Sequence, residues 1–324
     1  MSEDPIQNPH DRLFKEAFSR PETAAGFFQS YLPEDIRARL DWQTLQLQPG
    51  AYTDEAMRGS ESDLLYTIQL NKSPVLLYCL FEHQSTPDAW MPLRLLRYIL
   101  GIWEQHRKRN PGCTKLPPVL PLVLYQGGAQ WTADLSLSGL IDSIDGLGQY
   151  QPDFQHLLVD LTHIDAADMR GTLVGRAVLM ALKASRQGSS LELLRIFSLL
   201  AEFMRQQDSL GMIRTILRYI CIVDNNADFS DYIKQVEALK QPQLQEELMT
   251  IAEQLRKEGE QQGMQQGMQQ ALQEDVLEIL ELRFHSVSYS VKQQLADIHD
   301  AATLRRLHRL AVQAESIDAF TQGM

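Results

Sequence analysis

The sequence predicts an α/β fold in which helices pack against a mixed sheet, followed by an all-helical region and a small helical C-terminal domain. Three observations lead to this expectation. Residues 1–165 hold most of the prolines and all of the strand-like apolar runs, residues 166–254 show helical spacing throughout, and residues 255–273 are a Gln/Gly/Met-rich repeat ahead of a helical tail at 274–324. Segments that alternate between strand and helix patterns are typical of sheets covered by helices.

The first region begins with a helix, because Asn8-Pro9 is a helix-start signal and the apolar residues Leu13, Phe14, Ala17 and Phe18 follow at helical spacing. Val75 to Glu82 is almost wholly apolar, which is typical of a strand buried on both faces. The other predicted strands are Thr44 to Ala51, Ser62 to Leu70, Val119 to Tyr125 and Phe154 to Leu161, and a helix is predicted over 90–108.

The region 166–254 contains apolar residues at i, i+3 and i+4 spacing, for example Leu173, Ala177 and Val178, and is predicted to be a helical subdomain without chemistry of its own. In the repeat at 255–273, a G-x-Q-Q unit recurs every four residues. Because glycine weakens an isolated helix, this piece is either a flexible linker or a helix held by a partner chain. The tail at 274–324 is predicted to form two or three short helices.

Composition and charge exclude several classes of protein. The 324 residues carry a net charge of −12, which a simple DNA-coating protein would not have, so nucleic-acid binding would require a local concentration of basic residues. Three cysteines without a CxxC pair argue against a disulfide scaffold or a zinc–cysteine site. No apolar run is long enough for a signal peptide or a membrane span, so a soluble cytoplasmic protein is expected.

The chemistry is predicted to lie on two successive strands. Asp63 begins one of them and Glu82 ends the next, with Gln84 two residues further on. Two hairpin-related strands can place such carboxylates at neighbouring ends, and hard cations such as Mg²⁺ prefer carboxylate oxygens. The competing interpretation is that Asp63 and Glu82 are ordinary charges at strand ends, and the pattern by itself does not decide between the two.

Positive charge gathers on the predicted helix that follows. Residues 91–118 contain six basic residues and one acidic residue, a local charge of +5, with Arg94, Arg97, Arg107 and Lys108 as candidate phosphate contacts. The alternative is a solvated helix face. On the first helix, Asp11 and Lys15 lie one turn apart. They either face the site, with Lys15 as a further candidate nucleic-acid contact, or form an exposed pair.

The sequence around these residues resembles the Rpn family of recombination-promoting nucleases, also called YhgA-like transposases. Five runs carry the resemblance in the same order: His10-Asp11-Arg12-Leu13-Phe14-Lys15, Ser62-Asp63-Leu64-Leu65-Tyr66, Phe81-Glu82-His83-Gln84-Ser85, Met91-Pro92-Leu93-Arg94-Leu95-Leu96-Arg97-Tyr98 and Leu120-Pro121-Leu122-Val123-Leu124-Tyr125-Gln126-Gly127-Gly128. The repeat near residue 260 and the tail also look like the C-terminal region of that family.

The resemblance implies a PD-(D/E)XK-like restriction-endonuclease core at 1–165 and a DNA endonuclease, dependent on Mg²⁺ or Mn²⁺, that acts on double-stranded DNA and promotes recombination. It implies that Asp63 and Glu82 hold the metal and that Gln84 stands where the superfamily usually has lysine. A glutamine cannot act as a cation, although it can still position a water molecule.

Two further hypotheses remain open at this stage. The glutamine and the acidic net charge favour a catalytically weak DNA-binding or assembly module built on the nuclease fold. The repeat favours an oligomeric defence protein that assembles as a homo-oligomer through its C-terminal helical region.

Overall fold

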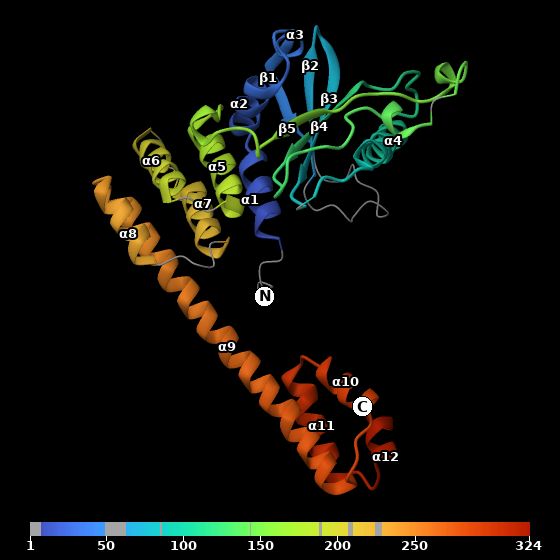
Figure 1. Ribbon diagram of the computed structural model, residues 1–324, viewed down its shortest axis with the longest axis vertical. Coiled ribbons are helices and arrows are strands. Elements are labelled where there is room, and N and C mark those ends of the chain that lie inside the picture. Colours follow the sequence, from blue (N-terminus) through green and yellow to red (C-terminus); the bar gives the residue numbers. More distant parts are fainter. Residues whose placement is uncertain are drawn as a thin grey trace. The chain divides into compact units, whose positions relative to one another are not determined.

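The computed structural model describes residues 8–48, 63–84, 86–142, 144–187, 190–206, 210–223 and 229–324. The chain divides into two compact units, Met1–Ile251 and Ala252–Met324. The first unit contains a single five-stranded sheet among the described residues, with helices on both faces (Figure 1). The α/β class and the mixed sheet expected from the sequence are therefore confirmed.

The strands follow one another across the sheet in chain order. They are β1 (Leu40–Leu47), β2 (Asp63–Leu70), β3 (Ser73–Glu82), β4 (Val119–Tyr125) and β5 (Leu157–Asp160). The first three pair antiparallel, whereas β3, β4 and β5 pair parallel. The carboxyl ends of three parallel strands therefore meet at one edge, where Glu82 lies level with Tyr125, and Tyr125 with Asp160.

The boundaries of three strands differ from the predictions. β3 begins at Ser73, two residues before the predicted Val75. The first strand begins at Leu40, earlier than the predicted Thr44, and the predicted positions 49–51 and 62 lie outside the described residues. The last strand is shorter than the predicted run from Phe154 to Leu161, because Gln155 forms an isolated antiparallel bridge with Ser136 before the parallel pairing begins.

The helix α4 (Met91–Arg109) covers one face of the sheet. Its buried residues Met91, Leu95 and Ile102 pack with Leu80, Val123 and other apolar side chains of β2, β3 and β4. The helix ends where the basic residues 107–109 occupy its last turn, a favourable place for positive charge.

The other face is covered by helices from both ends of the first unit. The helix α1 (Pro9–Phe18) places Phe14 on Phe81 of β3, with ring centroids 4.9 Å apart, and α2 (Pro21–Tyr31) and the short α3 (Glu34–Arg37) follow it. The helices α5 (Leu173–Gln187), α6 (Ser190–Gln206), α7 (Leu210–Val223) and α8 (Phe229–Ala238) complete this side, and both α5 and α7 contact α1. The helices α5 to α8 thus belong to the same unit as the sheet.

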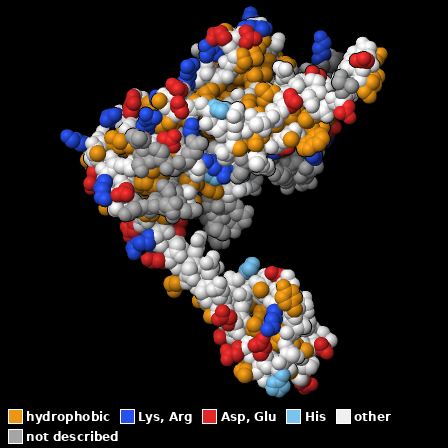
Figure 2. Space-filling view, viewed as in Figure 1, with side chains coloured by type: hydrophobic (Ala, Val, Ile, Leu, Met, Phe, Trp, Pro, Cys, Tyr) orange, Lys and Arg blue, Asp and Glu red, His pale blue; other side chains and the backbone are white. Residues whose placement is uncertain are grey.

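The repeat at 255–273 lies inside one long helix, α9 (Pro242–Phe284). Ion pairs one turn apart, Lys257–Glu253 and Arg256–Glu260, flank the start of the repeat, and its middle exposes uncharged side chains (Figure 2). The C-terminal unit is closed by α10 (Tyr289–Ala296), α11 (Ala301–Gln313) and α12 (Ile317–Gln322), which bury Leu304, Leu307 and Phe320 against Val276 and Leu280. Of the helices described, none is both long and apolar enough to cross a membrane.

Candidate active site

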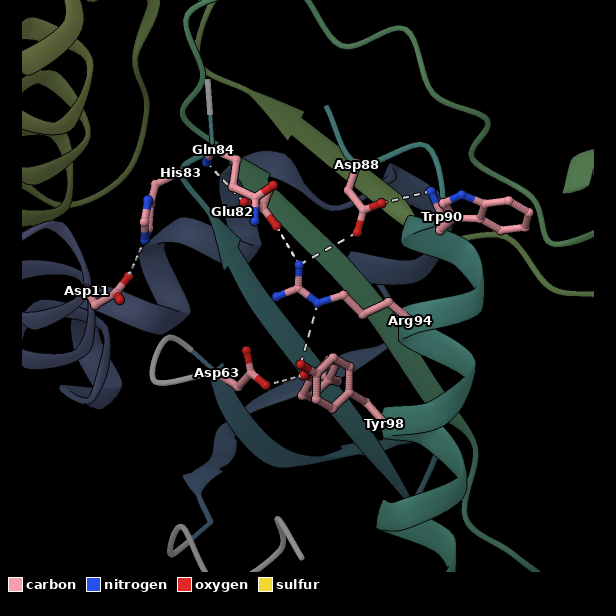
Figure 3. Close-up of polar contacts among 10 residues, drawn as sticks. Asp11, Asp63, Glu82, His83, Gln84, Asp88, Trp90, Arg94 and Tyr98 are labelled. Carbon is pink, nitrogen blue, oxygen red and sulfur yellow. Dashed lines mark hydrogen bonds and ion pairs between the residues drawn. The ribbon is translucent and has the colours of Figure 1, made fainter. Parts of the chain in front are cut away.

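The register of β2 and β3 brings the two predicted carboxylates to one edge and one face of the sheet. Asp63 is paired with Leu80, and Glu82 lies two residues further along the same strand. Because side chains alternate along a strand, Tyr78, Leu80 and Glu82 share a face, and the paired Asp63 projects on that same side. This is the face that α4 covers (Figure 3).

Glu82 is buried, with 3% of its surface exposed, and both of its carboxylate oxygens have partners. Arg94 of α4 donates from Nη1 to Oε2 at 2.7 Å, and the backbone N–H of Gln84 donates to Oε1 at 3.0 Å. A buried carboxylate requires such compensation, since its desolvation is otherwise very costly. The structure thus supplies Glu82 with a cation from the protein itself.

Arg94 is held from three sides. Besides Glu82, it contacts Asp88 at 3.8 Å and donates from Nε to the Tyr98 hydroxyl at 3.5 Å (Figure 3). Burial opposes the charge on the guanidinium, but Tyr98 and Glu82 outweigh burial and raise the pKa of Arg94. Arg94 therefore remains charged and fixed beside the carboxylate.

Asp63 accepts a 2.5 Å hydrogen bond from the hydroxyl of Tyr78, whose side chain lies under α4. Burial and the Asp63 carboxylate raise the pKa of Tyr78 well above its usual value, so the phenol stays protonated and acts as the donor. The contact orients one Asp63 oxygen toward the sheet.

Gln84 lies just beyond the end of β3, and its side chain is exposed. The strand alternation that would have placed it directly beside Glu82 stops at residue 82, because the chain turns so that the Gln84 N–H caps the Glu82 side chain. Gln84 consequently contacts Glu82 through its backbone N–H, whereas its side-chain amide is open to solvent.

The other predicted contacts are spread over the molecule. Arg97, Arg107 and Lys108 are exposed on α4, and Arg107 is about 20 Å along the helix axis from Arg94 at the usual rise per residue. Lys15 is half-buried on α1, which packs against the opposite face of the sheet. Of these candidates, Arg94 contacts a predicted carboxylate, that of Glu82.

A second polar cluster lies on that opposite face. His83 directly follows β3, and its side chain lies on the side of α1, where its Nε2 lies 3.3 Å from Oδ1 of the buried Asp11 (Figure 3). This contact raises the pKa of His83. Next to it, Nδ1 of His10 lies 2.7 Å from the hydroxyl of Tyr219, and burial lowers the pKa of His10 to about 4. These histidines were not among the predicted site residues. The position of His83 directly after Glu82 was the one sequence signal for it.

The ability of the site to hold a metal ion depends on two carboxylates. No cluster of three or more His, Cys, Asp or Glu side chains suited to a metal ion is found among the described residues. Mg²⁺, however, is commonly held by one or two carboxylates, with water and substrate phosphate oxygens completing its shell. Asp63 and Glu82 meet that smaller requirement in donor type, and Arg94 competes with a cation for Glu82.

Comparisons with known proteins identify the family of the chain. The family model described as Putative transposase, YhgA-like matches residues 8–211. An inactive recombination-promoting nuclease-like protein, RpnE of Escherichia coli K12, is 31% identical over 300 residues, covering 92% of this chain and 98% of the relative. The recombination-promoting nuclease RpnA of the same strain is 32% identical over 263 residues, covering 81% and 88% of the two chains.

A third relative is the recombination-promoting nuclease RpnD of Escherichia coli O157:H7, which is 30% identical over 258 residues and covers 77% of this chain and 95% of its own. The comparison with solved structures found no match. Because the family model spans well over half of the chain and these relatives extend over most of it, the chain belongs to the YhgA-like transposase family, together with the recombination-promoting nucleases.

Proposed function

We propose that this protein is a metal-dependent DNA endonuclease with a PD-(D/E)XK-like core, which hydrolyses phosphodiester bonds of double-stranded DNA and thereby promotes recombination. The observation that carries the proposal is that Asp63 and Glu82 lie on one face of the sheet and at neighbouring ends of β2 and β3. Two relatives that match most of the chain bear the name recombination-promoting nuclease, which supports the same activity class.

Asp63 and Glu82 are the residues that would hold Mg²⁺ or Mn²⁺. A metal bound there would lower the pKa of a water molecule and offset charge on the phosphoryl oxygens. Arg94 lies 2.7 Å from Glu82, so it must share or leave that carboxylate oxygen when a cation binds, and it is then available to a phosphate. The exposed side-chain amide of Gln84, two residues after Glu82, would be available to orient a water molecule.

The test is nicking of supercoiled plasmid by the full chain in Mg²⁺, in Mn²⁺ and in EDTA. Asp63→Asn and Glu82→Gln, which keep side-chain shape, are expected to lower the rate at least about 100-fold, the scale on which lost transition-state electrostatics act. Asp41→Asn is the matched control, because Asp41 is an exposed acid of β1 paired with Gln69 at the far end of β2. Unchanged cleavage by Asp63→Asn at saturating Mg²⁺ would refute the proposal.

A second candidate function is a catalytically weak DNA-binding or assembly module, including an oligomeric defence protein. The specific observation in its favour is that Arg94 and the Gln84 N–H already occupy both oxygens of Glu82. One relative that matches nearly the whole chain is named inactive. Retained binding of a labelled duplex without nicking, in Mg²⁺, Mn²⁺ and Co²⁺, would favour this candidate over the nuclease.

A further inference from the structure

A small pocket opens at the carboxyl edge of the sheet, on the face opposite to Glu82. It is lined by Gln126 and Gly127 after β4, by Leu161 and Thr162 after β5, and by Lys183 and Arg186 of α5. Its volume of about 10 Å³ is room for about one water molecule. Ligands of open α/β sheets commonly bind outside the carboxyl ends of parallel strands.

Two cationic side chains of α5 line this pocket. Lys183 is buried, with 8% of its surface exposed, and donates from Nζ to the carbonyl oxygen of Ile164 at 2.7 Å. Arg186 is exposed and donates through Nη2 to the carbonyl oxygen of His83. Each of these groups retains further N–H donors beyond the contact named. The pocket therefore presents one fixed and one exposed cation.

Gln126, which lines the pocket, has a side-chain oxygen that lacks a hydrogen-bond donor among the described residues. Gln126 is 1% exposed, and its Nε2 donates to the carbonyl oxygen of Leu182 and to Oγ of Ser185, which fixes the orientation of the amide. Its Oε1 is buried and has no hydrogen-bond partner among the described residues. A buried carbonyl oxygen in this position needs a donor, because burying it without one costs about 1–3 kcal/mol.

The pocket adjoins the candidate active site through the backbone. The N–H of Gln126 donates to the carbonyl oxygen of Glu82 at 2.8 Å, and Arg186 holds the next carbonyl, that of His83. Of the two cations of the pocket, Arg186 is thus hydrogen-bonded to the chain directly after the strand that ends at Glu82. Thr162 contributes little, because its hydroxyl is committed to Asp160.

We infer that this pocket binds a phosphate group of the nucleic-acid backbone, at a position beside the scissile phosphate. The phosphate oxygens accept from Lys183 and Arg186 at the mouth, and a water molecule beneath donates one hydrogen to Gln126 Oε1 and the other to the phosphate. The inference rests on the proposed function for the identity of the polymer, and it names α5 as a part of the DNA-binding surface that lies outside the predicted basic helix.

The test measures binding of a fluorescein-labelled DNA duplex in EDTA, where cleavage does not contribute. Arg186→Gln is expected to weaken binding about five- to tenfold near 0.1 M salt and to lower the slope of log K against log salt by about one. Arg205→Gln on α6, an exposed arginine in the last helical turn, is the matched control and is expected to change neither quantity. Arg186→Lys is expected to restore most of the salt slope.

A second arm adds inorganic phosphate to the full chain and follows the melting temperature, with chloride at equal ionic strength as the reference. Stabilisation of the unmodified chain by phosphate, reduced in Arg186→Gln, together with the loss of DNA affinity, supports the inference. Stabilisation by phosphate with unchanged DNA affinity would assign the pocket to a free phosphate compound and overturn the nucleic-acid assignment. No response in either arm would leave only a structural water in the pocket and overturn the inference entirely.

The two proposals fail separately. A chain that binds DNA through Arg186 but cuts in no metal refutes the nuclease and leaves the pocket assigned. A chain that cuts DNA, with cleavage and binding both unaffected by Arg186→Gln, refutes the pocket and leaves the nuclease.

Discussion

We predict that the ion pair between Arg94 and Glu82 stabilises the first unit, by an amount that can be worked from its geometry. We expect Arg94→Met and Glu82→Gln each to destabilise the first unit, and the double variant to lose less than the sum of the two. The physical reason is that each single change leaves one charge poorly compensated beneath α4, whereas the double change removes both charges and keeps most of the packing volume.

The magnitude follows from the geometry. The charged atoms lie 2.7 Å apart, and the side chains of Arg94 and Glu82 are 27% and 4% exposed. Charge centres about 4 Å apart attract by about 4 kcal/mol at an effective dielectric constant of 20. Desolvation removes part of this attraction, and Asp88, 3.8 Å from Arg94, partly replaces Glu82. We therefore expect each single change to cost about 2–3 kcal/mol and the coupling to be about 2 kcal/mol.

The assay is urea unfolding followed by tryptophan fluorescence. The tryptophans of the chain are Trp42, Trp90, Trp103 and Trp131, so the signal reports only on the first unit. A cost of about 2–3 kcal/mol moves the midpoint by about 1 M urea at the usual slope. The control cycle is Arg214→Met with Glu247→Gln, a 2.6 Å ion pair in the same unit whose arginine is 58% exposed, and its coupling should be much weaker.

A coupling below about 0.5 kcal/mol, or one no larger than that of the Arg214–Glu247 pair, would refute this reasoning. Glu82 would then be stabilised mainly by the Gln84 N–H, and Arg94 would compete little with a metal ion for Glu82.

Three further predictions concern other parts of the chain. Burial lowers the pKa of His156 to about 4, below its unfolded value of 6.5, so the free energy of unfolding should fall as pH decreases from about 6.5 to 4. In urea titrations at several pH values, His156→Leu should remove up to about 1.4 kcal/mol per pH unit of that slope. An unchanged slope would contradict the assignment. Gly127→Ala places a methyl group against the buried ring of Tyr125, whose hydroxyl donates to the carbonyl oxygen of Ala129. The change should lower the free energy of unfolding by about 1–3 kcal/mol. A melting temperature equal to that of the unmodified chain would exclude the clash. If the C-terminal helical region assembles the chain, deletion of residues 255–324 should lower the number of chains per particle, obtained by sedimentation as the measured mass divided by the mass of one chain. An unaltered number of chains per particle would exclude that role.

Much of the first unit could be predicted because its signals are local. The apolar run ending at Glu82 is long enough to define a strand buried on both faces, and Asn71-Lys72 marks the turn that pairs this strand with the one beginning at Asp63. An antiparallel hairpin joined by a short turn has a nearly determined register, so the shared edge of the two carboxylates followed from sequence. The helix α4 could also be predicted from a local signal, the helical spacing of the apolar residues that follow the two strands.

The repeat at 255–273 could not be assigned from sequence, because its glycines disfavour a helix while its four-residue period and lack of proline permit one. In the structure the segment continues the helix that begins at Pro242. Helix formation is cooperative, so well-formed turns on both sides propagate through a stretch that would be marginal alone.

The sequence alone determined which segments form the strands, that Asp63 and Glu82 lie at strand ends, and the resemblance to the family, since each depends on neighbouring residues or on a linear pattern. Tertiary structure decided which charge compensates Glu82, which face receives Asp11, and that α5 brings Lys183 and Arg186 to the end of β4. These contacts join residues far apart along the chain, such as His83 and Arg186, and depend on how helices pack across the whole sheet. No local periodicity encodes that choice, because the free energy that makes it is spread over the entire buried core.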